Sequence, residues 1–211
     1  MAGLLLAAGE GSRLGRAKAL VEFDGKLLVE RGVGVLADGG CDAVHVVLGA
    51  ERDQVAVRAD LAGALVVDNP DWAGGMASSL RAGLASLPAE VDAVVVALVD
   101  QPLIGADVVR RLRSACQAGA RVAVATYHGK RRNPVLLGRQ VWPEVIAATH
   151  DDVGARAYLT RHPEEITDVE CADIADPSDV DTAADLRRVR SALSSSRSSS
   201  RSPNADRRPA G

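Results

Sequence analysis

The residues with the clearest chemical potential lie in one short segment near the N-terminus. An apolar run is followed by three glycines, Gly9, Gly11 and Gly15, and the cations Arg13 and Lys18 lie among and after them. Glycine adopts backbone conformations that other residues avoid, and it lets main-chain N–H groups approach an anion closely. The segment therefore predicts a phosphate-binding loop in which the two cations neutralise a triphosphate.

Two common phosphate loops fit this spacing poorly. A Walker loop needs Gly-Lys-Ser/Thr, whereas Arg16 follows Gly15 and no hydroxyl residue comes next. In the dinucleotide fingerprint the third glycine comes one residue earlier than Gly15, although Glu30 lies about where a ribose-binding acid is expected. A Rossmann-type oxidoreductase and a plain glycine-rich turn with solvated cations therefore stay open as alternatives.

The elements that must position this loop follow an alternating pattern. Strands are predicted at residues 3–7, 43–48, 64–67, 91–99 and 121–125, and helices at 29–37, 76–87 and 108–116. Segment 91–99 is almost all Val, Ala and Leu, which is typical of a strand buried on both faces at the centre of a sheet. The second half of the chain is expected to be largely helical. The pattern predicts a three-layer, doubly wound α/β fold with a mostly parallel sheet.

Composition limits the domain organisation. The 211 residues are 47% hydrophobic and 25% charged, which suits one α/β domain over residues 1–193. Residues 194–211 are mainly Ser and Arg, so we expect a disordered tail. The net charge of −3 includes this basic tail, so the remainder is more acidic, which disfavours a nucleic-acid partner.

Location and redox state follow from the same composition. No apolar run reaches the roughly 18 residues of a membrane span and no cationic signal segment begins the chain, so we expect a cytoplasmic protein without a membrane partner. The chain has three cysteines, an odd number, and they are widely spaced, which indicates reduced thiols. The scattered histidines give a histidine-based metal cluster little support.

A carboxylate follows the strand predicted at residues 91–99. Asp100 comes directly after this strand, and Pro102 follows it closely. In doubly wound sheets, ligands bind beyond the carboxyl ends of the strands, where the glycine loop also lies. Asp100 is therefore a candidate ligand for a cation shared with the triphosphate, and the alternative is an Asp that caps a turn.

The glycine-rich segment resembles the signature Leu-Ala-Ala-Gly-x-Gly/Ser-x-Arg-Met/Leu-Gly-x-x-Lys of nucleotidyltransferases that activate sugars and cofactors. The resemblance implies that Arg13, Lys18 and Asp100 are catalytic and that Asp100, in its Asp-x-Pro context, binds Mg²⁺. It also implies that the loop binds the nucleotide through Leu6, Ala7, Ala8, Gly9, Gly11 and Ser12.

Four later segments are similar to the molybdenum cofactor cytidylyltransferases, at residues 69–80, 132–138, 152–156 and 179–186. The similarity implies that Ser79 binds the nucleotide and that Asp181 is a second Mg²⁺ ligand. It also implies acceptor contacts from Asn133, Asp152 and Arg156. Asp152 and the pair Asp181 and Thr182 can instead cap helices, and Arg156 can be a plain surface cation.

The chemistry implied by this family is transfer of CMP from CTP to a phosphorylated acceptor, with release of pyrophosphate. A phosphate monoester has a second pKa of about 6, so it is a charged nucleophile at neutral pH and needs no general base. The family's cytidylyl enzymes have Ala at the position of Ala8, where guanylyl enzymes usually have Gly.

The implied acceptor is a molybdopterin-type cofactor, with a client molybdoenzyme as a further partner. GTP as donor, another acceptor such as a sugar phosphate or phospholactate, and a non-catalytic carrier of the pterin cofactor stay open as alternatives.

Overall fold

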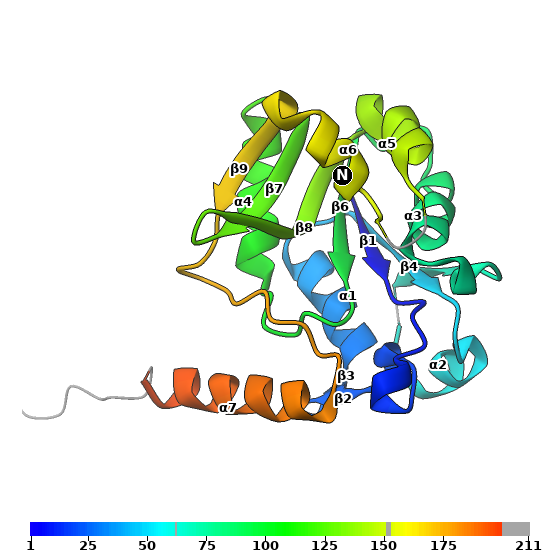
Figure 1. Cartoon of the computed structure of the whole chain (residues 1–211), viewed down its shortest axis with the longest axis vertical. Coiled ribbons are helices and arrows are strands. Elements are labelled where there is room, and N and C mark those ends of the chain that lie inside the picture. The colour runs from blue at the N-terminus through cyan, green and yellow to red at the C-terminus, as the bar shows by residue number, and fades with distance from the viewer. Residues whose placement is uncertain (62, 151–152, 200–211) are drawn as a thin grey trace, which may run out of the picture.

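The computed structural model describes residues 1–61, 63–150 and 153–199 and contains a seven-stranded sheet with helices on both faces (Figure 1). The predicted α/β fold is confirmed. In spatial order the strands are β5 (Ala64–Asp68), β4 (Ala43–Leu48), β1 (Ala2–Leu6), β6 (Ala93–Leu98), β8 (Lys130–Gly138), β7 (Val122–Tyr127) and β9 (Ile166–Glu170).

The middle of the sheet consists of strands that are buried on both faces. β1 lies parallel to β4 and β6, and nearly every residue of the three strands is buried. Continuous apolar runs of this kind suit parallel strands covered by helices on either side. β6 is the fourth of the seven strands, so the prediction that segment 91–99 lies at the centre is confirmed.

The second half contains four α-helices among the described residues, but also two strands that the expectation of a largely helical second half left out. β8 runs antiparallel between β6 and β7, and β9 forms the outer edge, parallel to β7. β8 begins with Lys130-Arg131-Arg132-Asn133-Pro134, and this polar start makes the apolar residues that follow difficult to recognise as part of a strand. The residues of β9 are half-buried or exposed, as an edge strand allows, so it lacks the apolar run of a central strand.

The main helices divide between the two faces. α1 (Leu28–Asp38) and α4 (Ala106–Gln117) pack together on one face. α3 (Met76–Ala85), α5 (Trp142–Ala148) and α6 (Arg156–Arg161) cover the other. The short helix α2 (Arg52–Arg58) follows β4.

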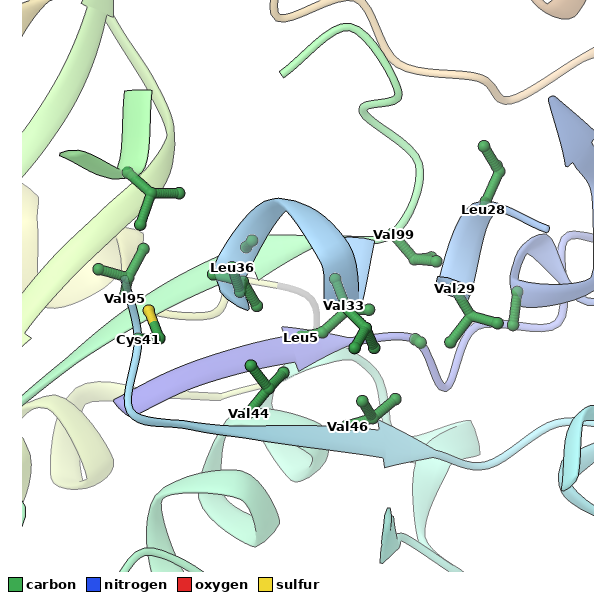
Figure 2. Packing of buried hydrophobic residues seen from close by; sticks show 14 of the residues in the cluster. Leu5, Leu28, Val29, Val33, Leu36, Cys41, Val44, Val46, Val95 and Val99 are labelled. Atoms are coloured by element: carbon green, nitrogen blue, oxygen red, sulfur yellow. The ribbon is translucent and has the colours of Figure 1, made fainter. Parts of the chain in front are cut away.

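Alternation along the strands supplies two cores. Leu5 of β1 belongs to the core under α1, whereas its neighbour Leu4 belongs to the core under α3. Figure 2 shows the first core, in which Val33 and Leu36 of α1 lie over Leu5 and over Val46 of β4. Both layers hold the carboxyl ends of β1 and β6 side by side.

Several short elements complete the chain. A hairpin of β2 (Glu22–Phe23) and β3 (Lys26–Leu27) lies beside the last helix, α7 (Ala183–Ser199) (Figure 1). Short 3₁₀ helices are η1 (Ser12–Leu14), η2 (Lys18–Leu20), η3 (Trp72–Gly74), η4 (Arg139–Val141) and η5 (Pro163–Glu165).

The predicted tail boundary is wrong, because α7 continues through residue 199, beyond the expected start of disorder at residue 194. The helix has an apolar face: Val189 is buried in the α1 core, and Leu186 and Leu193 pack against that core. The remainder of the predicted tail, residues 200–211, lies outside the described residues.

All three cysteines are free, as predicted, and two of them are buried. Burial raises the pKa of the Cys41 thiol to about 11, so it is protonated and unreactive at neutral pH. Among the described helices, none has both the length and the apolar character that crossing a bilayer would require.

Candidate nucleotide and metal site

The glycine loop begins where β1 ends and requires glycine at two positions. Gly11 and Gly15 have φ values of 62° and 69°, in the left-handed region. A Cβ at Gly11 would lie 2.3 Å from the Arg16 carbonyl oxygen, so the fold of the loop excludes a side chain there. The φ angle of Gly9 is not in the left-handed region, and a Cβ at Gly9 would meet nothing within 4 Å. The expected conformational need for glycine at residue 9 is therefore not found.

The segment after β4 forms hydrogen bonds with the glycine loop on both sides of its glycines. The Ala50 amide donates to the Ala8 carbonyl at 3.0 Å, and the Ala17 amide donates to Oε1 of Glu51 at 2.8 Å. Gly49 packs directly on Trp72, where a Cβ would lie 2.4 Å from the Trp72 Cβ. Glu51 carries no local sequence signal for this role, because nothing near it in the sequence links it to the loop.

Lys18 joins three parts of the chain that are distant in sequence. Its Nζ lies 2.6 Å from Oδ2 of Asp100, just after β6, and 2.5 Å from Oδ1 of Asp181, just before α7. Burial alone would lower the pKa of Lys18, but the charge of Asp100 and the hydrogen bonds to both carboxylates outweigh it and raise the pKa. Lys18 is therefore a fixed positive charge at the end of the sheet.

Asp181 is also paired with the second predicted cation. Nη2 of Arg13 lies 3.0 Å from Oδ2 of Asp181, and the Arg13 side chain is 68% exposed. The hydrogen bond from Lys18 is the main cause of the lowered pKa of Asp181. Thr182 caps α7, because its hydroxyl accepts from the Asp185 amide while the Asp185 carboxylate accepts from the Thr182 amide. Capping is thus performed by Thr182, which leaves Asp181 to the cations.

The carboxylates fit a divalent cation. Oδ1 of Asp100 is buried and has no hydrogen-bond partner among the described residues. An unpartnered buried carboxylate oxygen is costly, and such oxygens are the ligands that Mg²⁺ and Mn²⁺ prefer. Burial raises the pKa of Asp179, and the nearby charges of Asp100 and Asp181 raise it further. Gln101 donates to Oδ1 of Asp179 at 2.8 Å. Asp100 and Asp181 could therefore hold a metal ion with Asp179 nearby.

A cavity of about 460 Å³ opens beside these charges, which is large enough for a nucleotide. Its charged lining comes from the glycine loop and from Lys18, Asp100 and Asp181, and its apolar lining includes Trp72 and Met76, which pack against the core under α3. It is lined by Leu6, Ala8, Gly9, Glu10, Gly11, Ser12, Arg13, Lys18, Trp72, Ala73, Gly75, Met76, Ser79, Leu98, Val99, Asp100 and Asp181. Of the residues predicted to bind nucleotide, Ala7 does not line the cavity, because its side chain is buried in the core under α1.

Two of the three predicted acceptor residues, Asn133 and Arg156, lie away from the lining of this cavity. Asn133 is half-buried on β8, and its carbonyl accepts from the Tyr127 hydroxyl; Arg156 is exposed at the start of α6. Asp152 lies outside the described residues. Gly154 packs against the cavity residue Met76, since a Cβ on Gly154 would lie 2.8 Å from the Met76 sulfur.

Glu30 does not have the arrangement expected of a ribose-binding acid. Its carboxylate accepts hydrogen bonds from the Leu27 amide at 2.9 Å and from the Asp60 amide at 2.8 Å. The first bond satisfies an N–H at the start of α1, and the second holds the chain after α2. Glu30 therefore has a structural role, which weakens the dinucleotide interpretation.

One histidine lies close to two glutamates at the start of η5. Ligand atoms of His162, Glu164 and Glu165 lie within 4.8 Å of one another on the surface. The Tyr158 ring stacks on His162 at 4.5 Å, and its hydroxyl donates to Glu165. These contacts account for the arrangement without an ion.

Comparison with known proteins places the chain in a family. Residues 3–166 match the model of the MobA-like NTP transferase domain. The nicotine blue oxidoreductase of Paenarthrobacter nicotinovorans is 37% identical over 195 residues, which cover 89% of this chain and 95% of the relative. The molybdenum cofactor guanylyltransferase of Rhizobium johnstonii is 32% identical, over 80% of this chain and 78% of the relative.

Solved structures agree with this grouping. Rv0371c from Mycobacterium tuberculosis H37Rv is 28% identical with a TM-score of 0.78, over 90% of this chain and 97% of that one. Its complex with manganese has a TM-score of 0.75. The molybdopterin-guanine dinucleotide biosynthesis protein A of Archaeoglobus fulgidus, 17% identical over 92% of this chain and 100% of that one, has the same fold at a TM-score of 0.67. The chain therefore belongs to the MobA-like NTP transferase family and is a nucleotidyltransferase by family.

Proposed function

We propose that this protein transfers CMP from CTP to a phosphorylated acceptor, with a molybdopterin-type cofactor as the preferred acceptor. The observation that carries the proposal is the meeting of Arg13, Lys18, Asp100 and Asp181 at one end of a nucleotide-sized cavity. Such an arrangement suits a triphosphate together with a metal ion, because the cations would pair with phosphate oxygens and the carboxylates would bind the metal.

The chain's own groups account for the reaction through charge and position. An acceptor phosphate oxygen forms a bond to the α-phosphorus while the bond from that phosphorus to the bridging oxygen breaks, and pyrophosphate leaves. Lys18 and Arg13 stabilise the negative charge on the phosphate oxygens. None of the described residues that line the cavity is His or Cys, which agrees with a phosphate nucleophile that needs no general base.

Mg²⁺ is the proposed metal, held by Asp100 and Asp181. When bound, it would neutralise charge on the triphosphate. The unpartnered Oδ1 of Asp100 supports this assignment within the chain. The manganese complex of Rv0371c supports the use of a divalent cation in a related structure.

CTP is the proposed donor because the cavity is lined by Ala8, at the position where guanylyl-transferring relatives usually have glycine. A methyl group leaves less room for a purine. Several of the relatives are named guanylyltransferases, so the comparison of CTP with GTP is the decisive measurement.

The first experiment measures pyrophosphate release from CTP, GTP and ATP, each with Mg²⁺ and with or without molybdopterin. We expect CTP- and acceptor-dependent release by the wild type and a loss of at least about 100-fold in Asp100→Asn. Asp107→Asn on the exposed start of α4 is the matched control and should retain full release. Preference for GTP would reverse the argument from Ala8.

A second candidate function is oxidoreduction, which the similarity to the nicotine blue oxidoreductase favours. The structural role of Glu30 weakens it, because the carboxylate that would bind a dinucleotide ribose is already used. Consumption of NADH or NADPH by the purified protein with nicotine blue, unaffected by Asp100→Asn, would favour this candidate. Failure of NAD(P) to protect the protein against thermal unfolding would count against it.

A non-catalytic carrier of the pterin cofactor is the remaining alternative. A carrier has no need for two cations and two carboxylates gathered at one cavity. It would bind molybdopterin tightly without CTP and release no pyrophosphate. We propose a cytoplasmic site of action, with a client molybdoenzyme as the receiver of the product.

A further inference from the structure

Asn69 is a buried polar residue that sits directly behind the cavity wall. It follows β5, and only 3% of its surface is exposed. Its Oδ1 accepts a hydrogen bond from the Asp71 amide at 3.1 Å. A backbone amide can only donate, so this contact identifies which side-chain atom is oxygen and which is nitrogen. The nitrogen Nδ2 therefore points toward α3.

Nδ2 of Asn69 donates to two neighbouring serines at the start of α3. The distances are 2.9 Å to Oγ of Ser78 and 3.0 Å to Oγ of Ser79. Both hydroxyl oxygens are thus acceptors toward Asn69, so each hydroxyl proton must point elsewhere. Ser78 donates its proton to the Gly75 carbonyl at 2.9 Å.

The Ser79 hydroxyl proton has no acceptor among the described residues, and Ser79 lines the cavity. The serine is otherwise buried, so the cavity is the direction left for its proton. Its neighbours among the lining residues include Trp72 and Met76, which pack against the core under α3, whereas Val99 and Val180, next to Asp100 and Asp181, belong to the core under α1. A nucleotide whose phosphates lie at Lys18 and Asp100 would then have its base on the α3 side of the cavity, where a few polar groups fix its orientation.

We infer that Asn69 is a positioning residue that turns the Ser79 hydroxyl into a hydrogen-bond donor for the nucleotide base. This inference rests on the proposed function, since it assigns the α3 side of the same cavity to the base. A donor at this point pairs with a base atom that accepts, such as O2 or N3 of cytosine. Asn69 itself does not touch the ligand.

The test compares two ligands that differ only in the base. Dissociation constants of CTP and of ribose 5-triphosphate, which has no base, are measured by calorimetry with Mg²⁺ for each variant. In Asn69→Asp a carboxylate oxygen replaces Nδ2 and accepts the Ser79 proton, which removes the donor from the cavity. Ser79→Ala removes it directly, and Ser78→Ala is the control, because Ser78 shares the contact with Asn69 but does not line the cavity.

We expect CTP binding to weaken about tenfold in Asn69→Asp and Ser79→Ala, the size of one lost hydrogen bond. Binding of ribose 5-triphosphate should stay unchanged in both, and Ser78→Ala should change neither ligand. A variant with no buried charge, Asn69→Ala, guards against misfolding of Asn69→Asp. When Asn69→Ala is combined with Ser79→Ala, the dissociation constant of CTP should not change beyond the effect of Ser79→Ala alone.

Equal weakening of both ligands would show that Asn69 only supports the wall, and the inference would be overturned. Unchanged CTP binding in the two Asn69 variants would overturn it as well. Wild-type protein that binds neither ligand would instead refute the proposed function, and the inference with it. Pyrophosphate release by the wild type separates these cases.

Discussion

Lys18 is the residue on which the site depends. It is the one side chain that forms ion pairs with both Asp100 and Asp181 among the described residues, and these carboxylates come from the middle and from the last part of the chain. The two short ion pairs hold the carboxylates together in the absence of a metal ion. In the proposed reaction the same ammonium group serves the triphosphate, so its charge and its length both matter.

Lys18→Gln tests this role at the scale of one residue. We expect CTP-dependent pyrophosphate release to fall at least about 100-fold, because a neutral amide cannot stabilise the phosphate charge. Circular dichroism should show an unchanged fold. Lys26→Gln, on the exposed strand β3, should release pyrophosphate at the wild-type rate. Equal rates for wild type and Lys18→Gln would refute a role for Lys18 in the reaction.

Residues differ in how well the sequence reveals them. Lys18 and Asp100 were identified because each lies in a short motif next to a predicted strand end. Asn69 and Asp179 lie inside segments that were noted, but their roles depend on hydrogen bonds to Ser79 and Gln101 that only the fold creates. Single-residue roles of this kind have no local signal.

At the scale of elements, the loop after β4 positions the loop after β1. Glu51 has φ of 52° and accepts from the Ala17 amide, next to Lys18. Two strand ends that lie side by side in a parallel sheet can brace each other in this way. The glycine loop is thus held from outside as well as by its own backbone.

Glu51→Ala tests this brace. The Ala17 amide would lose its partner, and we expect CTP affinity to fall about five- to tenfold as the loop loosens. Glu51→Gln keeps an acceptor oxygen and should bind CTP nearly as the wild type does. Calorimetric titration measures both. Equal losses in the two variants would contradict the brace and indicate a need for the negative charge.

The turn between β7 and β8 is tied to β9 by a single carboxylate. Glu170 accepts from the amides of Ala172, Gly129 and His128, and from the Thr126 hydroxyl. These hydrogen bonds, chiefly those from Ala172 and Gly129, lower its pKa from 4.5 to about 2. Because the folded pKa lies below the unfolded one, the stabilisation is complete above about pH 4.5 and is lost as the pH falls toward about 2.

Glu170→Gln should therefore unfold at a lower temperature than the wild type at pH 7. The difference should shrink as the pH falls from about 4.5 to about 2, because the wild-type carboxyl is then protonated. Thermal unfolding followed by circular dichroism at a series of pH values measures this. Glu90→Gln, at an exposed position, should follow the wild type throughout. A gap independent of pH would contradict the charge-based account.

Whole elements were predictable where their composition was uniform. The central strands were identified to within a few residues because both faces are buried, whereas β8 and β9 were missed. Lys130 to Pro134 begin β8 with residues common in loops. Asp168 and Glu170 place charges in β9, where Arg131 forms an ion pair with Asp168 and the amides of the β7–β8 turn donate to Glu170. Tertiary partners overrode local preference in both strands.

At the scale of the molecule, the last helix belongs to the body of the protein. Val189 of α7 is 1% exposed in the α1 core, and Arg190 donates to the Glu22 carbonyl on the β2–β3 hairpin (Figure 1). Val180, just before α7, is buried in the same core, and its amide donates to the Asp100 carbonyl at 2.8 Å. The core thus fixes Asp181 beside the cavity.

Val189→Ala should lower the free energy of unfolding by about 2 kcal/mol, because it leaves a cavity in this core. Val57→Ala makes the same chemical change on α2, where Val57 is 86% exposed, and should change the free energy of unfolding by less than about 0.5 kcal/mol. Urea denaturation measures both. Equal effects in the two variants would show that α7 does not contribute to the core.

The ion pairs of Asp181 also have a consequence for synthesis on the ribosome. Arg13 and Asp181 are separated by 168 positions, and Lys18 and Asp181 by 163. The phosphate loop and the central strands emerge from the ribosome long before their last acidic partner does. A nascent chain can therefore build most of its sheet early, but it completes the charged site only after residue 181 has left the exit tunnel.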